Sequence, residues 1–341
     1  MGRNHEVTNR QLLLDEQGEL REPGWSRSLV QQYDRSMIKA PKFRIKEWDY
    51  YLVLNDKFAG AFTISDDGYI GLQSVSLLSF DGEPWEHTET VLNAFPMGKL
   101  KLPSDSSSGI TEYSDKRLQM KFAVEDGTRH ITCAFDRFYE GKPFSCDIVL
   151  QQPEMDSMVI ATPWDKKHAF YYNQKINCMR ASGYMEYDGV RYEFDPETDF
   201  GTLDWGRGVW TYDNTWFWGS GNADINGNAF GFNIGYGFGN TKAASENVLF
   251  YNSVVHKLDD ITFCIPESGY MDPWKFTSSD GRFETEFTPV LDRAAKLDFK
   301  LLVSDQHQVF GRMNGKAVLD DGTEIQIKDV MCFAEKVHNR Y

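Results

Sequence analysis

The sequence is poor in cysteine, has no long apolar run and carries no excess of positive charge. The cysteines are Cys133, Cys146, Cys178, Cys264 and Cys332. Because they are odd in number, widely separated and without Cys-x-x-Cys spacing, they favour neither a disulfide framework nor a zinc site. No apolar run is long enough to cross a bilayer, and residues 1–8 lack the apolar core of a signal peptide. We therefore expect a cytoplasmic protein without an integral membrane span.

The charge balance and the missing motifs exclude several function classes. Acidic residues outnumber basic ones by 51 to 36, for a net charge of -15, which disfavours binding to nucleic acid or anionic membranes. The seven histidines are dispersed, with no His-x-His or His-Glu-x-x-His arrangement. The chain has no phosphate-binding loop and no Gly-x-Ser-x-Gly elbow. We expect no metal and no cofactor.

Short turn signals and alternating flanks indicate β structure throughout. Aromatic residues, which favour strands, make up 14% of the chain. Leu118, Met120 and Phe122 alternate with polar residues before one of the turns, as in half-buried strands. Pairs typical of tight hairpin turns occur at Asp67-Gly68, Asp81-Gly82, Asp126-Gly127, Asp188-Gly189, Asn226-Gly227, Asp280-Gly281, Asn314-Gly315 and Asp321-Gly322.

The length predicts two β-barrels in tandem. Antiparallel strands joined by tight turns form sandwiches or barrels, in which few strand edges stay unpaired. One barrel of eight strands needs well under 341 residues. We predict an all-β protein with few short helices, the best candidate being Ser26 to Met37. The expected division is an N-terminal segment with a short helix (1–40), a first barrel (41–163) and a second barrel (164–341).

The segment Phe200 to Gly221 is the first candidate site. It contains Trp205, Trp210, Trp216 and Trp218. It also contains Asp204 and Arg207, which Gly206 can bring together by bending the strand. A carboxylic acid under aromatic cover can act as a general acid, with Arg207 holding it in place. The alternative is a structural ion pair at a glycine-rich bend, with the tryptophans filling the core.

Polar residues elsewhere in the second half extend this candidate site. Lys175 and Asn177 would share one face of a strand, with Asn173 two residues before Lys175, and a buried polar row of this kind would need partners. Tyr172 precedes Asn173 in the same strand. Glu246 is a candidate second carboxylate and Asn247 its polar neighbour; the alternative is a solvated loop.

The segment Ala229 to Gly239 has one aromatic face and one glycine face. Asn233 lies among the glycines, which let a ligand or another part of the chain approach closely. The alternative reading of these glycines is a strongly curved barrel strand. Asn233 completes the predicted set of ligand-binding residues.

Several of these motifs together resemble the family of the domain of unknown function 2804. The Asp-Trp-Gly-Arg-Gly-x-Trp core is the most specific of them. The matching segments are 24–25, 171–175, 201–210, 216–221, 246–247, 310–311 and 334–335. The resemblance extends over nearly the whole chain and implies no particular activity.

A more distant similarity is to two-barrel, lipocalin-like (calycin) proteins. These include carotenoid hydratase, the AttH-like proteins, tocopherol cyclase and some fungal pericyclases. The feature that is similar is an Asp beside Trp in the second half, here Asp204-Trp205. The resemblance implies two antiparallel lipocalin-like β-barrels and cofactor-free chemistry on apolar substrates. In this chain the continuation is Trp-Gly-Arg, which differs from those proteins.

Three functions are compatible with these features. The first is a barrel that binds a lipophilic or aromatic small molecule, with acid-catalysed hydration, cyclisation or isomerisation by Asp204. The second is a carrier that uses the same cavity without catalysis. The third is a carbohydrate-binding or carbohydrate-active protein, with Trp216 and Trp218 stacking on sugars and Asp204 and Glu246 as the carboxylate pair.

Overall fold

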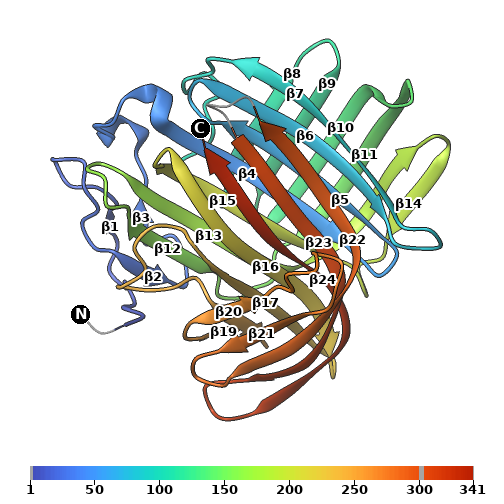
Figure 1. Ribbon diagram of the computed structural model, residues 1–341. Helices are drawn as coiled ribbons and strands as arrows, with labels where there is room; N and C mark the ends of the chain where they lie inside the picture. The colour runs from blue at the N-terminus through green and yellow to red at the C-terminus, as the bar shows by residue number, and fades with distance from the viewer. Residues whose placement is uncertain (1–2, 299–302, 341) are drawn as a thin grey trace.

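The chain folds into two curled antiparallel sheets, which confirms the predicted all-β fold class (Figure 1). The computed structural model describes residues 3–298 and 303–340. In these ranges the helices are two short 3-10 turns, η1 (Arg35–Met37) and η2 (Lys42–Arg44). No helix in the described ranges is long and apolar enough to span a membrane.

The first sheet has 13 strands and contains most of the N-terminal two thirds of the chain. Its main path runs β7-β6-β5-β4-β15-β13-β11-β10-β9-β8, with β12, β14 and β2 attached beside β13. The strands are β2 (Gly24–Ser26), β4 (Ile45–Leu54), β5 (Phe58–Asp66), β6 (Ile70–Ser79), β7 (Trp85–Ala94), β8 (Gly109–Ser114), β9 (Leu118–Glu125), β10 (Thr128–Tyr139), β11 (Lys142–Gln151), β12 (Met158–Pro163), β13 (Phe170–Tyr187), β14 (Val190–Phe194) and β15 (Phe200–Val209).

The second sheet has nine strands and follows directly in sequence. Its order is β19-β18-β17-β16-β24-β23-β22-β21-β20. The first strand of this sheet in sequence, β16, therefore pairs with the last, β24, near the centre of the sheet. The strands are β16 (Asp213–Ile225), β17 (Asn228–Tyr236), β18 (Val248–Tyr251), β19 (Val254–Lys257), β20 (Ile261–Cys264), β21 (Trp274–Ser278), β22 (Phe283–Asp298), β23 (Val303–Val318) and β24 (Glu324–Arg340). A separate two-stranded parallel sheet pairs β1 (Gln11–Leu12) with β3 (Gln31–Gln32).

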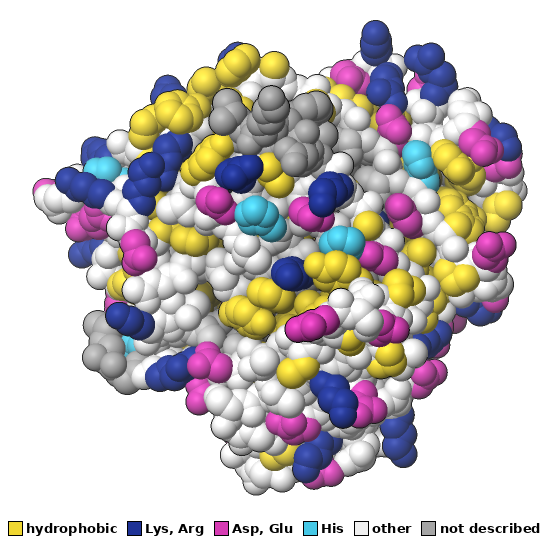
Figure 2. Space-filling model, in the orientation of Figure 1, with side chains coloured by type: hydrophobic (Ala, Val, Ile, Leu, Met, Phe, Trp, Pro, Cys, Tyr) yellow, Lys and Arg dark blue, Asp and Glu magenta, His cyan; other side chains and the backbone are white. Residues whose placement is uncertain are grey.

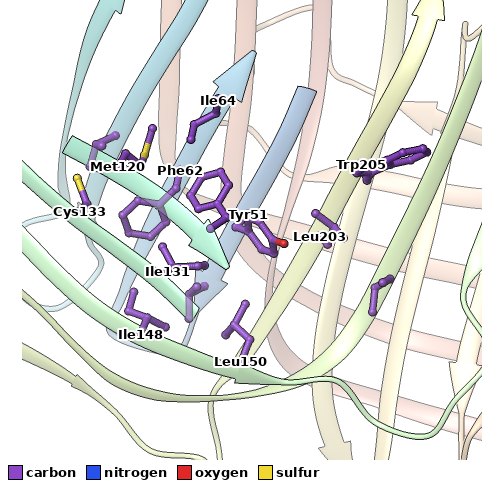
Figure 3. Packing of buried hydrophobic residues seen from close by; sticks show 14 of the residues in the cluster. Tyr51, Phe62, Ile64, Met120, Ile131, Cys133, Ile148, Leu150, Leu203 and Trp205 are labelled. Atoms are coloured by element: carbon purple, nitrogen blue, oxygen red, sulfur yellow. The ribbon is translucent and has the colours of Figure 1, made fainter. Parts of the chain in front are cut away.

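Three apolar layers form the core. One lies inside the first sheet, where Tyr51, Phe62 and Ile131 gather (Figure 3). Another lies inside the second sheet, and a third joins the two sheets and includes Tyr171 and Trp218. Because side chains alternate across a strand, central strands such as β13 supply two layers at once. The layer between the sheets therefore lies against both of them.

Three of the eight predicted turns have the expected type I′ conformation. Four others have positive φ only at the glycine, namely Asp67-Gly68, Asp81-Gly82, Asp280-Gly281 and Asp321-Gly322, and the eighth is not a turn. At Asp126-Gly127, Asp188-Gly189 and Asn226-Gly227, both residues have positive φ, as a type I′ hairpin requires. Asn314-Gly315 lies inside β23, where the pairing with β24 shifts register. There Gly315 has a φ of 145° at an irregularity of the ladder, so this pair is a bulge and not a turn.

The N-terminal helix prediction was wrong. Residues from Ser26 to Met37 contain the end of β2, the short β3 and only the three-residue turn η1. Backbone pairing explains the difference, because β2 adds to β12 and β3 pairs with β1. The predicted boundary at residue 163 falls at the end of β12, inside the first sheet, and the chain passes to the second sheet between Val209 and Asp213. The division into domains stays a prediction.

Asn177 joins the two sheets at a bulge in β13. The pairing of β13 with β15 shifts register between Ile176 and Met179. The buried Asn177 amide there donates to Ser220 Oγ (2.9 Å) and to Asn222 Oδ1 (2.9 Å), both on β16. Across from it, a Cβ on Gly231 would come within 2.9 Å of the Cys178 sulfur. Close approach of β17 to β13 therefore requires glycine, as the glycine face predicts.

We predict that Asn177→Ala lowers the free energy of unfolding by about 2–4 kcal/mol. The change removes the hydrogen bonds of the Asn177 amide to Ser220 and Asn222 and leaves their acceptors without that donor. Urea unfolding followed by tryptophan fluorescence measures the effect. Gln119→Ala, on an exposed position of β9, is the control and should change stability by less than about 0.5 kcal/mol. Equal stabilities for both variants would contradict the proposed joining role of Asn177.

Candidate functional site

The centre of the layer between the sheets contains a buried ion pair. Lys175 on β13 and Asp204 on β15 are directly opposite each other in the ladder. Lys175 Nζ lies 2.9 Å from Asp204 Oδ1, and Asn173 Nδ2 donates to the same oxygen at 2.6 Å. The Lys175 ammonium also lies 3.9 Å from the ring centroid of Trp218, so it has a cation–π contact. One cation is thus held by a carboxylate from its own sheet and an indole from the other.

Glu246 is the second carboxyl group of this layer. It is buried, and Tyr171 donates a long hydrogen bond of 3.4 Å to its Oε2. Burial raises the pKa of Glu246 to about 7, opposed by the positive charge of Lys175 and reinforced by the negative charge of Asp204. Its other oxygen, Oε1, has no hydrogen-bond partner among the described residues. Glu246 therefore has the environment of a carboxylic acid that holds its proton near neutral pH.

A third buried carboxyl group, Glu335 on β24, lies at the side of Trp216. Trp216 Nε1 donates to Glu335 Oε1 and Gln308 Nε2 to Oε2, each at 2.9 Å. Burial raises the pKa of Glu335, while these two donors and the charges of Arg293 and Lys175 oppose the shift. The layer thus holds three carboxyl groups, and the charge of Lys175 acts on all of them.

Aromatic rings cover one side of these groups. Trp210 lies at the centre, with the centroids of five neighbouring rings 5.4–6.2 Å away. Tyr171 stacks on Phe238 at 4.9 Å with nearly parallel rings. The rings around Trp210 are those of Trp48, Trp164, Tyr171, Trp216 and Phe238. Trp48, Trp164 and Trp216 are only half-buried, so the aromatic group extends from the acids toward the surface.

Hydrogen bonds from β17 position the second carboxyl group. Trp218 Nε1 donates to Asn233 Oδ1 (2.7 Å), and Asn233 Nδ2 donates to the backbone oxygen of Glu246 (2.9 Å). Asn247 accepts from the Gly235 amide at 2.7 Å. A Cβ at Gly235 would come within 2.6 Å of Glu246 Oε1, so the glycine leaves the space that the carboxyl group occupies. Asn233 and Asn247 both hold the segment that contains Glu246.

The predicted pair of Asp204 and Arg207 is not formed. Residues 200–209 pair with β4 without a register shift, so Gly206 makes no bulge and positions 204 and 207 face opposite sides. Arg207 points into the first sheet, where its Nη2 lies 3.0 Å from Asp49 Oδ1. Gly206 instead provides space for a tryptophan, because a Cβ there would come within 2.0 Å of the Trp48 ring.

Other predicted site residues are divided between two locations. Lys175, Asn233, Trp210, Trp216 and Trp218 lie with Asp204 and Glu246 in the layer between the sheets. Trp205 and Tyr172 lie with Arg207 on the other face, inside the first sheet.

Asn173 belongs to the predicted polar row, whereas Tyr171 and Gln308 were not predicted, although the strand period points to Tyr171. Asn173 is two residues before Lys175, and Tyr171 two residues before Asn173, so all three share one face of β13. Gln308 and Glu335 come from β23 and β24, far along the chain. Only the pairing of β24 with β16 brings Glu335 beside this site. No sequence feature near Glu335 predicts the pairing of β24 with β16.

The arrangement contains the groups that proton transfer requires. No group of three or more His, Cys, Asp and Glu side chains within residues 3–298 and 303–340 is placed to hold a metal ion. General acid catalysis often uses two carboxyl groups in different environments. One is buried and keeps its proton, as Glu246 does here, while the other is ionised in an ion pair, as Asp204 is.

Solved structures of other proteins resemble this chain at low sequence identity. CghA has a TM-score of 0.50 at 10% identity, and the match covers 98% of this chain and 97% of CghA. An AttH-like protein from Nitrosomonas europaea gives 0.49 at 12% identity, with 89% and 96% covered. Kievitone hydratase from Nectria haematococca gives 0.46 at 11% identity, with 87% and 88% covered. The likeness to CghA shows a shared fold alone.

No curated protein sequence matches the chain. The family model for the domain of unknown function 2804 matches residues 4–341, in agreement with the Asp-Trp-Gly-Arg-Gly-x-Trp core and the segments around it. The chain therefore belongs to the family of the domain of unknown function 2804.

Proposed function

We propose that this protein binds a small lipophilic or aromatic molecule between its two sheets and transfers a proton to it without a cofactor. Glu246 is the proton donor in this proposal. The ion pair of Asp204 with Lys175 stabilises the positive charge that develops on the substrate. The reaction class is acid-catalysed hydration, cyclisation or isomerisation.

The observation that carries the proposal is the environment of Glu246. A buried carboxyl group whose pKa is about 7 is half protonated at neutral pH, so it can both give and take a proton there. Its Oε1 has no partner among the described residues, which leaves that atom available to a ligand. Asn173 Oδ1 and Gln308 Oε1, also buried, have no partner within the described ranges either. Unpaired buried polar atoms are rare in native proteins, and these three, on Glu246, Asn173 and Gln308, lie in the layer between the sheets.

The steps follow from this placement. Glu246 donates its proton to a carbon of a carbon–carbon double bond, and a carbocation forms. The carboxylate of Asp204 and the faces of the surrounding indoles favour that charge. In a hydration, water adds to the cation and returns a proton to Glu246. In an isomerisation or cyclisation, loss of a proton from the substrate restores Glu246.

The two alternative functions have less support. Trp218 is an unsuitable platform for sugars because the Lys175 ammonium already occupies its face and Asn233 binds its N–H. Trp216 donates a hydrogen bond to Glu335 and packs against Trp210 in a T-shaped contact, so it is no more suitable. A carrier without catalysis uses the same layer, and the experiment below distinguishes it from an enzyme.

The first prediction from the proposed function concerns Glu246→Gln. Molecules that co-purify with the protein from its own host are identified by native mass spectrometry and then incubated with purified protein in D2O. We expect the wild type to introduce one deuterium on carbon per turnover. The variant should be slower by roughly 100-fold or more while it still binds, because glutamine keeps the shape but cannot donate as an acid.

Two controls accompany this experiment. Glu284→Gln, on β22 in the second sheet, should leave deuterium incorporation unchanged. Binding without deuterium incorporation by the wild type would identify a carrier and refute the catalytic proposal. Unchanged turnover in Glu246→Gln would remove Glu246 from the mechanism.

The second prediction is a pH-dependent stability difference. The pKa of Glu246 is raised above its unfolded value of 4.5, so its stabilising contribution is complete below about pH 4.5 and is lost as pH rises through about 7. Glu246→Gln cannot ionise. Its stability relative to wild type should therefore increase between pH 4.5 and 7.5, by at most about 3 kcal/mol, in urea unfolding experiments. A difference that is constant over this range would contradict a raised pKa.

The third prediction separates the structural from the chemical role of Asp204. Asp204→Asn leaves the buried Lys175 ammonium without its carboxylate and should lower the free energy of unfolding by about 3–5 kcal/mol. The double variant with Lys175→Met removes that unpaired charge and should recover most of the loss. If the recovered double variant still binds ligand but has lost turnover, the ion pair acts in catalysis. If its turnover is normal, the pair is structural only.

A further inference from the structure

Two loops of the first sheet expose aromatic rings beside lysines. Lys42 and Phe43 belong to η2, which leads into β4, and Phe95, Lys99 and Lys101 belong to the loop that follows β7. All five residues are exposed, Phe43 to 49% and Phe95 to 59%. They are called the basic aromatic patch below. In Figure 2, hydrophobic and basic side chains gather at the upper left, where Figure 1 places the chain that leads into β4.

The turn between β5 and β6 joins the two loops. The Met97 amide donates to the Gly68 backbone oxygen at 3.0 Å, and the Gly98 amide donates to Asp66 Oδ2 at 2.6 Å. On the Gly68 side, a Cβ would come within 2.4 Å of the Phe43 backbone oxygen. Both loops therefore pack against the same turn, which brings the two halves of the patch into one surface.

The loop after β7 holds its aromatic side chain outward in a strained conformation. Phe95 has a φ of 52° and Met97 a φ of 51°, a region that costs free energy for residues other than glycine. A hydrogen bond from the Phe95 amide to the Tyr69 backbone oxygen (2.9 Å) fixes this conformation. The ring stays more than half exposed, so its own burial does not offset the cost. An apolar side chain held exposed in this way indicates a contact outside the chain.

The patch is positively charged although the whole chain is acidic. The segments 35–46 and 92–104 contain no aspartate or glutamate. Lys42, Lys99 and Lys101 form no ion pair with any residue that the structure describes. The net charge of -15 disfavours contact with an anionic surface only as a sum over the whole protein. At physiological ionic strength charges act over about 8 Å, so the lysines nearest to the surface decide the contact.

The carboxyl groups near the patch lie below it or at its ends. Asp66 and Asp67, in the turn that joins the loops, are buried. Asp34 and Asp105 are exposed, but they lie just beyond the outer ends of the two segments. Each of these two accepts a hydrogen bond from the backbone amide two residues further on. The patch itself therefore combines apolar rings with cations and has no acidic member.

The patch adjoins the surface end of the aromatic group in the layer between the sheets. Arg44, the residue after Phe43, donates from Nη2 to the Trp210 backbone oxygen at 2.6 Å. Trp210 contacts Trp48 and Trp164, which are both half-buried. An apolar molecule that reaches the patch is therefore close to the rings that lead to the buried carboxyl groups.

We propose that the basic aromatic patch docks this protein on the surface of an anionic phospholipid bilayer. The rings of Phe43 and Phe95 enter the boundary between headgroups and acyl chains, and the three ammonium groups pair with lipid phosphates. Docking places the aromatic group beside the lipid, where the apolar ligand dissolves. Only this last step, the transfer of the ligand from the bilayer, rests on the proposed function.

Sedimentation with lipid vesicles tests the docking in the full-length protein without any ligand. One set of vesicles contains phosphatidylcholine alone, and the other contains equal parts of phosphatidylcholine and phosphatidylglycerol. We expect the partition coefficient to be at least about tenfold higher for the anionic vesicles and to fall as sodium chloride is added. Equal partitioning into both vesicles, or none, would overturn the proposal. This result would leave the proposed proton transfer untouched, since no turnover is measured, and failure of deuterium incorporation would equally leave the docking untouched.

Two double variants assign the binding to the patch. Lys42→Gln with Lys99→Gln should lower the partition coefficient by about 25-fold, because each lysine near an anionic surface contributes about fivefold. Phe43→Ser with Phe95→Ser should lower it by about tenfold or more while the salt dependence stays. All four positions are exposed, and unchanged melting temperatures would show that the variants fold.

The matched control is Lys116→Gln with Lys328→Gln. It makes the same change in net charge at two exposed lysines outside the patch, of which Lys328 lies in a cleft with Leu54, at the other end of β4. Its partition coefficient should stay within about twofold of the wild type. A loss as large as that of the patch lysines would overturn the assignment to this surface. Unchanged binding after replacement of both phenylalanines would show that no ring enters lipid, and the patch would then be a surface for an acidic protein and not for a bilayer.

Discussion

The ion pair of Lys175 with Asp204 is the interaction around which the layer between the sheets is organised. Placing two charges in that layer costs desolvation, which is offset only when both have close partners. Asp204 has Lys175 and Asn173, and Lys175 has the carboxylate and the Trp218 face. Because Trp218 belongs to β16 and the other three residues to β13 and β15, the same contacts fix how the two sheets meet. The charge of Lys175 then acts on Glu246 and Glu335 as well.

Strands with two buried faces explain why two polar sites lie so close in sequence. Every residue of β15 is buried, so its alternating side chains enter two different layers. Asp204 enters the layer between the sheets, while Trp205 and Arg207 enter the first sheet. The surface contributes little to either arrangement: over most of the face in Figure 2, basic and acidic side chains are interspersed.

The fold could be predicted from the sequence because its signals are local. Asp126-Gly127 and Asn226-Gly227 specify hairpins through the conformation of two adjacent residues. The site could be predicted only in part, because its contacts are not local. Asp204 was assigned to Arg207 three residues away, whereas its partner is Lys175, its direct neighbour across the ladder. Register between distant strands cannot be deduced from spacing along one strand, and a two-residue period places Asp204 and Arg207 on opposite faces when no bulge intervenes.

The choice of an ionisable residue at position 246 favours a chemical role for the site over a purely structural one. A glutamine would have nearly the same shape and would not lose stability as pH rises, yet the chain has an ionisable group there, with one oxygen unpaired among the described residues. Gly235 strengthens this point, since any side chain at that position would collide with the carboxyl group. Two residues are thus arranged so that an acid with a pKa of about 7 lies under aromatic cover. Groups that reduce stability and have perturbed pKa values concentrate at functional sites, and this is the physical reason to look for chemistry at Glu246 before any other carboxyl group of the chain.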